Sequence, residues 1–298
     1  MRKKKVVSLI QAIIFMLPAA VLLIIFVYGP LVSSIGYSFT KFENFKPVDF
    51  VGLKNFRTAF EDKLFWNSIV LTFKWVILNT LLPTLVGLCL AILLEFFTKR
   101  RIFTNVSRTV LFMPMMMSLV SVGLLWALIY DSNIGIIPGV LKMLGYTGKF
   151  NVFAKANHAL YVAFIPVIWQ SAGFSMVIFS AAAQGISRDI IEASLVEGAT
   201  KMQQVKYVMF PAMMNTIIMV MMINMISGFK AFDLLYTLTK GGPGSSTNIT
   251  AIYSYNQAFA SFRFDYSSAI MVLLLVCVIV FLLLFSLITK PIKKKYSA

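Results

Sequence analysis

Six apolar stretches of the chain are each long enough to cross a lipid bilayer as a helix. About 20 predominantly apolar residues are needed to span roughly 30 Å of hydrocarbon. Because lipid offers no hydrogen-bond partner for open backbone groups, helices are the expected structure of such stretches. The pattern therefore predicts an all-α integral membrane protein with six transmembrane helices, at residues 8–29, 67–94, 109–130, 159–183, 210–232 and 267–289.

The first stretch follows four basic residues and in this respect resembles the start of a signal peptide. It is longer than the apolar region of such a peptide and reaches Tyr28 and Pro30. We therefore expect an uncleaved first helix. After it, residues 42–62 mix aromatic and charged side chains, which indicates an amphipathic helix on the outer membrane surface.

The chain divides by these patterns into three parts, and its basic residues indicate how they are oriented. Residues 1–66 hold the first helix and the outer segment, residues 67–289 form the transmembrane core, and residues 290–298 are a basic tail. More than half of the 27 Lys and Arg residues lie in segments that share one side with the N-terminus, at residues 1–7, 95–108, 184–209 and 290–298. Because basic loops remain in the cytoplasm, we expect both termini to be cytoplasmic, in a bacterial cell membrane.

Composition supports a membrane protein and excludes several chemistries. Hydrophobic residues make up 59% of the chain and charged residues 13%, far from the balance of a soluble domain. The net charge of +16 comes in clusters beside apolar stretches, so we expect lipid and no nucleic acid as a partner. A single histidine, His158, and the separated Cys89 and Cys277 offer no metal site and no catalytic constellation.

A polar interruption between the fourth and fifth stretches is the most informative segment. Ser187 is a candidate N-cap for a helix whose first turns carry Asp189 and Glu192, where carboxylates meet the positive end of the helix dipole. The spacing of the apolar residues predicts one helical face, formed by Ile191, Leu195, Ala199 and Met202.

Two residues mark changes of direction in this segment. Gly198 interrupts the predicted helix, so we expect a bend or a close backbone approach there. Pro211 marks the first turn of the fifth stretch, where a missing N–H is tolerated. By these features alone the segment is either a surface helix in a solvated loop or a helix that docks into a partner protein.

The same segment resembles the EAA signature of permeases of binding-protein-dependent ABC importers. That signature combines an EAA triplet, a Gly-Ala pair and a terminal proline, here Glu192, Ala193, Ser194, Gly198, Ala199 and Pro211. Ser194 replaces the usual third alanine, and Phe210 stands where leucine is usual. Other parts of the chain resemble the carbohydrate permeases related to the larger maltose-transporter permease, without its extra outer domain; they are FVGLKNF (50–56), FMP (112–114), FKAFDLLYTLTKGGPGSST (229–247) and FDYSSA (264–269).

The resemblance implies a type I ABC importer permease fold with a coupling helix at residues 187–209. It also implies a second permease, in a heterodimer, two copies of an ATPase subunit, an extracytoplasmic solute-binding protein and a sugar substrate. Glu192 and Glu197 would contact the ATPase, and Ala193, Gly198 and Ala199 would permit close packing. ATP and Mg would be used by the ATPase, since this chain has no G-x-x-x-x-G-K-[ST] phosphate loop and binds no cofactor of its own.

Polar residues within the apolar stretches are candidates for the solute pathway. By position relative to the signature, the resemblance implies that the pathway is lined by Gln170, Ser171, Phe174, Asn224 and Gly228. Hydrogen bonding between helices is the alternative role for such residues.

Other functions remain open at this point. An ion-gradient transporter should carry acidic residues deep in its spans, and none is present in these stretches. An intramembrane enzyme lacks candidate catalytic residues. A structural membrane subunit, or a permease for a non-sugar solute such as a glycerol phosphate, would fit the same pattern of spans.

Overall fold

The computed structural model describes residues 2–43, 45–98, 100–145, 148 and 151–296. It divides the chain into two compact units. Unit 1 comprises Met1–Trp66 and Ser254–Val276, and unit 2 comprises Asn67–Tyr253 and Cys277–Ala298. Residues 254–276, which the sequence division assigns to the transmembrane core, thus belong to the same compact unit as residues 1–66.

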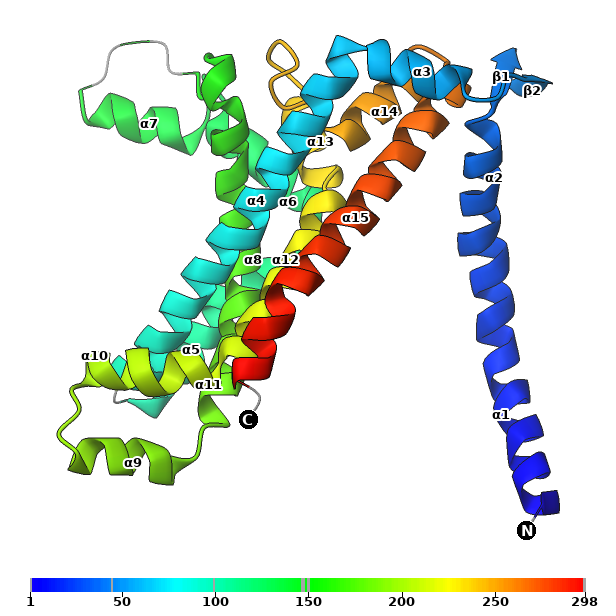
Figure 1. Cartoon of the computed structure of the whole chain (residues 1–298). Coiled ribbons are helices and arrows are strands. Elements are labelled where there is room, and N and C mark those ends of the chain that lie inside the picture. The colour runs from blue at the N-terminus through cyan, green and yellow to red at the C-terminus, as the bar shows by residue number, and fades with distance from the viewer. Residues whose placement is uncertain (1, 44, 99, 146–147, 149–150, 297–298) are drawn as a thin grey trace. The chain divides into compact units, whose positions relative to one another are not determined.

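Unit 1 begins with an uninterrupted helical rod, drawn in blue in Figure 1. It consists of α1 (Arg2–Leu23), the π-helical turn η1 (Ile24–Tyr28) and α2 (Gly29–Tyr37). Pro30 lies just after the π turn η1 inside this continuous helix, and a local change in helical hydrogen bonding is expected beside a residue that lacks the backbone N–H. The candidate span therefore covers Ile14–Tyr37 and ends later than the predicted stretch at 8–29.

The segment after this rod differs from the expected amphipathic helix. Strands β1 (Thr40–Glu43) and β2 (Lys46–Phe50) pair as an antiparallel hairpin, and only α3 (Lys54–Glu61) is helical. The side-chain amide of Asn55 donates to the carbonyls of Ser38 and Thr40, at 3.0 and 2.9 Å. These bonds connect α3 to the start of the hairpin, and they join residues that a helical pattern would not bring together.

Unit 2 and the C-terminal part of the chain are helical. The elements in chain order are α4 (Lys63–Ile92), η2 (Leu93–Phe97), α5 (Arg101–Phe112), η3 (Met113–Met116), α6 (Leu119–Tyr130), α7 (Ile136–Met143), α8 (Ala156–Gln184), α9 (Arg188–Val196), α10 (Lys201–Gln204), η4 (Val205–Met209), α11 (Phe210–Ala212), α12 (Met214–Phe229), α13 (Asp233–Thr239), α14 (Thr250–Phe259) and α15 (Phe264–Tyr296). The predicted basic tail continues α15 as far as Tyr296, and residues 297 and 298 lie outside the described residues.

Among the described residues, four continuous helices are long and apolar enough to span a membrane, at Ile14–Tyr37, Lys63–Phe97, Ala156–Gln184 and Phe264–Ile292. The third and fifth predicted stretches each correspond to a bent pair of helices. Ile102–Met116 and Leu119–Tyr130 meet at 99°, and Lys201–Ala212 and Met214–Phe229 meet at 67°. The predicted number of six spans is reached when each bent pair counts as one span.

Proline chemistry accompanies both bends. Pro114 lies in η3, after which Met117 and Ser118 are extended and the Ser118 hydroxyl caps α6 by accepting from the backbone N–H of Ser121 at 3.1 Å. Pro211 lacks the N–H that an α-helix requires and lies between the π turn η4 and the bend at Met213. Helix breaks of this kind are expected next to proline.

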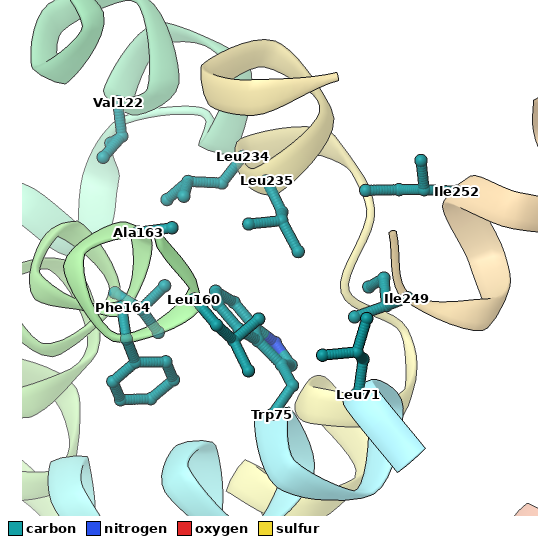
Figure 2. Packing of buried hydrophobic residues seen from close by; sticks show 11 residues of the cluster. Leu71, Trp75, Val122, Leu160, Ala163, Phe164, Leu234, Leu235, Ile249 and Ile252 are labelled. Carbon is teal, nitrogen blue, oxygen red and sulfur yellow. The ribbon is translucent and has the colours of Figure 1, made fainter. Parts of the chain in front are cut away.

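Buried apolar clusters hold unit 2 together. Figure 2 shows one of them, in which Trp75 of α4 lies among side chains from α6, α8, α13 and the segment before α14. Another cluster joins α4 and α8 to η4 and α12 through Leu88, Met176, Phe179 and Met209. It fixes the base of α10–α12 on the long helices, and thereby positions the polar segment that precedes them.

Candidate functional site

The predicted coupling segment forms two helices joined by a tight turn. Ser187 caps α9, since its hydroxyl accepts from the backbone N–H of Asp189 at 3.3 Å. At the other end Gly198 has a φ of +80°, and the backbone N–H of Ala199 donates to the carbonyl of Ser194 at 2.9 Å. This is the hydrogen-bond pattern of a Schellman C-cap, which favours glycine at the left-handed position.

A second helix begins directly after this turn. Thr200 and Gln203 form a reciprocal capping box at the start of α10, and the helix continues through η4 to α11. The spacing predicted that Ala199 and Met202 share a helical face with Ile191 and Leu195. This prediction is wrong, because the turn at Gly198 separates the two pairs. Nothing lies within 4 Å of a Cβ placed at Gly198. Within the described chain, glycine at this position therefore permits the turn and does not make room for a neighbouring backbone.

Most of the surface of α9 is exposed and carries both apolar and acidic side chains. Ile190 and Leu195 are each 55% exposed and Val196 is 90% exposed. Glu192, Ala193 and Glu197 are exposed as well, and Ser194 is half-buried. In Figure 1, α9 and α10 lie at the end of unit 2 that holds the C-terminus, opposite α7. This arrangement leaves a short, capped helix exposed at that end of unit 2.

Gln204 connects α9 to α10 and was not recognised from the sequence. It is 4% exposed, and its amide donates to the hydroxyl of Ser194 at 2.9 Å and to the carbonyl of Ile191 at 3.4 Å. The Ser194 hydroxyl in turn donates to the Ile191 carbonyl at 2.6 Å. Ser194, which replaces the usual third alanine of the EAA triplet, thus has a specific hydrogen-bond partner in Gln204. In the sequence, this contact is indicated only by the presence of a glutamine ten residues after Ser194.

A cavity of about 860 Å³ lies beneath α9, between it and the ends of α4, α5 and α8. Within it Arg108 forms an ion pair with Glu95, and the amide of Gln184 lies against both. Lys201 donates to the carbonyl of Phe96 at 2.9 Å. These contacts cross-link the elements on which α9 and α10 rest.

A cavity of about 440 Å³ lies between α4, α8, α12 and α13. Gln170, Ser171 and Asn224 line it, together with Trp75 and Phe232. Its volume is within the range of about 300–1,000 Å³ that is usual for small-molecule sites. The structure therefore brings together three of the five residues that the sequence assigned to the solute pathway.

Asn224 also connects three helices. Its side-chain amide donates to the hydroxyls of Thr84 at 3.0 Å and Ser175 at 3.3 Å, and its backbone carbonyl accepts from the side-chain amide of Asn79 at 2.5 Å. In contrast, no hydrogen bond is recorded for the amide of Gln170 within the described part of the chain, although this residue is only 7% exposed. Asn224 is thus engaged between helices, whereas Gln170 lines the cavity without such a contact in the described chain.

Of the remaining pathway candidates, Ser171 lies at the cavity, whereas Phe174 and Gly228 do not line it. The hydroxyl of Ser171 donates to the carbonyl of Val167 at 2.5 Å and leaves its oxygen at the cavity. Phe174, half-buried on α8, is outside the cavity lining. Gly228 packs against α4, where an added Cβ would lie 3.1 Å from both the Cβ of Asn79 and the Cα of Val76. Gly228 therefore permits helix contact and does not enlarge the cavity.

Among the residues that the structure describes, no group of three or more His, Cys, Asp and Glu side chains could hold a metal ion.

Comparisons with known proteins place these features in a family. The chain is 34% identical over 273 residues to a probable ABC transporter permease of Pyrococcus horikoshii, covering 91% of this chain and 92% of that protein. It is 33% identical to a probable starch degradation products transport system permease of Thermoanaerobacterium thermosulfurigenes, with 83% of each covered. It is 26% identical to a trehalose/maltose transport system permease of Thermococcus litoralis, with 91% of each covered.

The fold agrees with these relatives. A chain of a bacterial alginate ABC transporter, solved in complex with an alginate pentasaccharide-bound periplasmic protein, superposes with a TM-score of 0.83 at 21% identity and covers 98% of both chains. Residues 84–297 match the family model described as the binding-protein-dependent transport system inner membrane component. The resemblance carried by the EAA segment is thereby confirmed, and the chain belongs to this family of membrane-embedded ABC transporter permeases.

Proposed function

We propose that this chain is a permease subunit of an ATP-driven importer that receives a sugar or oligosaccharide from an extracytoplasmic binding protein. Relatives named for starch degradation products and for trehalose and maltose support this substrate class. The cavity lined by Trp75, Gln170 and Phe232 suits it chemically. Amide groups can bond sugar hydroxyls, and aromatic rings can contact the apolar C–H patches of a sugar.

The observation that carries the coupling role is α9. It is capped at both ends, and its exposed face combines Glu192 and Glu197 with apolar side chains. A helix of this kind fits a groove on a soluble partner, where the apolar residues contribute contact area and the carboxylates contribute specificity. We assign that partner as an ATPase subunit, whose closure around ATP and Mg would move α9 and the helices behind it as a rigid body.

The remaining partners follow from the same assignment. Two ATPase copies would bind on the cytoplasmic side, one to this chain and one to a second permease of a different sequence. Both termini and α9 would then be cytoplasmic, and the binding protein would dock on the opposite side. ATP hydrolysis belongs to the ATPase, and this chain contributes the membrane path.

Substitution of Gly198 tests the coupling role. A tryptophan there would occupy a left-handed backbone position at φ +80° and would protrude from the turn after α9. We expect the Gly198→Trp variant to remain in the membrane, to lose uptake and to hydrolyse ATP without solute. The measurements are uptake of labelled sugar and ATPase activity in proteoliposomes that hold the complete transporter.

Gly185→Ala is the matched control, because Gly185 ends α8 with a φ of −77° and an added Cβ would make ordinary contacts there. We expect this variant to retain uptake. The coupling role is wrong if the Gly198→Trp transporter carries solute at the unaltered rate.

A phosphorylated solute such as a glycerol phosphate is the second candidate substrate. Lys230 lines the cavity and could pair with a phosphate, although Asp233 lies there too. Uptake of a labelled sugar that is inhibited by excess neutral oligosaccharide and not by glycerol 3-phosphate would favour the sugar assignment. The opposite pattern of competition would favour the phosphate.

A further inference from the structure

Five phenylalanines of unit 1 form a cluster that the transport function does not explain. Phe42 and Phe45 come from the hairpin, and Phe259, Phe262 and Phe264 come from the connection between α14 and α15. Their ring centroids lie 5.5 Å apart for Phe45 and Phe262, 5.6 Å for Phe45 and Phe264, 6.1 Å for Phe42 and Phe264, and 5.9 Å for Phe259 and Phe264. We call these five residues the aromatic patch.

Two residues of the patch have an unusual backbone conformation. Phe45 has a φ of 64° and Phe262 a φ of 56°, so both bulky residues occupy the left-handed region. This conformation costs a non-glycine residue roughly 1–2 kcal/mol. The two side chains are nevertheless 66% and 62% exposed, so burial within this chain does not offset the cost. Strain that persists in this way often marks a functional surface.

Hydrogen bonds within unit 1 hold the patch in place. The backbone N–H of Phe42 donates to the carboxylate of Asp265 at 3.3 Å, which connects β1 to the first turn of α15. The hydroxyl of Tyr266 donates to the carboxylate of Asp62 at 2.6 Å. The positions of the patch residues are therefore supported by hydrogen bonds between distant parts of unit 1.

The position of the patch along the chain indicates what covers it. One candidate span ends at Tyr37 and another begins at Phe264, so the patch follows the first by five residues and includes the first residue of the second. It must therefore lie near the depth at which both helices leave the hydrocarbon. Segments that lie in the membrane–water interface place Trp, Phe and Leu side chains at the boundary between headgroups and acyl chains, whereas a contiguous apolar surface exposed to water is uncommon in proteins.

Charged groups next to the patch suit the same environment. Lys41 and Glu43 form an ion pair at 2.6 Å, and the hydrogen bond with Lys41 lowers the pKa of the Glu43 carboxyl, so that the pair stays charged at neutral pH. The guanidinium of Arg263 lies 4.3 Å from the ring centre of Tyr266. Such groups can remain among lipid headgroups while neighbouring apolar atoms enter the acyl region.

We propose that the aromatic patch is inserted into the interfacial layer of the bilayer, where it binds the headgroup and upper acyl region of lipids. The hairpin β1–β2 is then a lipid-facing element and is not available for docking the solute-binding protein. With the orientation proposed above, the patch lies in the outer leaflet. The lipid contact itself depends on neither the substrate nor the ATPase assignment.

Spin labels test the depth of the patch. In a Cys89→Ser, Cys277→Ser background, single labels are placed at Phe45→Cys or Phe262→Cys in the complete transporter, reconstituted in nanodiscs of phosphatidylcholine and phosphatidylglycerol. Collision rates are measured with oxygen, which concentrates in lipid, and with a water-soluble nickel chelate. A label at Phe26→Cys, whose native side chain is 70% exposed on the first span, gives the collision rates expected in lipid. A label at Ser132→Cys, on an exposed turn, gives the rates expected in water.

We expect the labels at positions 45 and 262 to meet the nickel chelate several-fold less often than the label at 132, and to resemble the label at 26 with oxygen. Nickel access equal to that of position 132 would overturn the proposal. Protection that arises only after the binding protein is added would identify a protein docking surface instead. If the cysteine variants do not assemble, Phe45→Trp and Phe262→Trp with brominated lipid provide the same distinction. The four native tryptophans give the background quenching of the unsubstituted transporter. Quenching of the added fluorescence above this background supports the proposal, and its absence contradicts it.

Discussion

At the scale of single residues, the Ser194–Gln204 pair shows how one polar contact positions a helix. Gln204 is buried, and its amide reaches Ser194 and the Ile191 carbonyl across the turn at Gly198. A buried amide that loses its partner costs about 1–3 kcal/mol, whereas replacement of both partners by apolar groups of similar shape can be nearly neutral. The pair therefore makes α9 and α10 move together.

This asymmetry predicts the outcome of a double-mutant cycle. We expect Ser194→Ala to raise the ATP hydrolysed per solute imported, because Gln204 loses its 2.9 Å partner and α9 is held less firmly. The double variant Ser194→Ala, Gln204→Met should recover much of the coupling, since no buried amide is left unsatisfied. Uptake and ATPase assays on the reconstituted transporter measure the ratio, and additive losses in the double variant would contradict this role.

The two amides of the cavity should respond differently to removal. We expect Gln170→Ala to raise the KM for uptake several-fold and to leave thermal stability unchanged, because the structure records no hydrogen bond for this amide in the described chain. Asn224→Ala should lower the midpoint of thermal unfolding, since its bonds to Thr84 and Ser175 are lost. Uptake kinetics and thermal unfolding of each purified variant separate the two effects, and equal behaviour of the variants would refute the distinction.

At the scale of secondary-structure elements, small residues set how closely the helices of unit 2 approach. An added Cβ at Gly87 would lie 2.5 Å from the Cβ of Ser175, and one at Gly173 would overlap the backbone of Leu111. Close approach at small residues is a principal source of helix association in membranes, where apolar area alone gives little driving force. The contact at Gly173 holds α5 against α8, just before the bend that follows η3.

Gly173→Ala is therefore expected to destabilise the protein by about 1–3 kcal/mol, because the neighbouring atoms belong to backbone and cannot rotate away. The measurement is the midpoint temperature of thermal unfolding of the purified transporter. Gly139→Ala is the control, since nothing lies within 4 Å of its added Cβ in α7 and alanine favours a helix. A midpoint as high as that of the unsubstituted transporter for Gly173→Ala would show that α5 can shift freely.

At the scale of the whole molecule, the proposed orientation places the termini and α9 on one side of the membrane and the α6–α7 turn on the other. Single cysteines at Glu197 and Asn133, both exposed, report on this in a background without Cys89 and Cys277. We expect a membrane-impermeant maleimide added to intact cells to label position 133 and to leave position 197 unlabelled until the cells are opened. Labelling of position 197 from outside would invert the topology and remove the ATPase assignment.

Much of this protein could be predicted from local sequence. The apolar stretches follow from length and composition, because hydrocarbon selects about 20 apolar residues irrespective of their neighbours. The EAA segment, its Ser187 cap and the glycine at its turn are also local, since capping depends on a few adjacent residues. These local features were sufficient to predict the helical membrane fold and to recognise the family.

Only the tertiary structure decided how these elements are used. The bends of 99° and 67° depend on which helices pack behind Pro114 and Pro211, and the hairpin at Thr40–Phe50 depends on partners outside its own sequence. Asn224 is bound to residues 49 and 140 positions away, and Gly228 faces α4, so neither assignment could be made from spacing. Local sequence decides which segments enter lipid as helices, because hydrocarbon leaves a backbone no other way to satisfy its hydrogen bonds. Contacts between distant residues decide the structure of the segment outside the lipid, the direction of each helix and which side chains remain free to bind a solute.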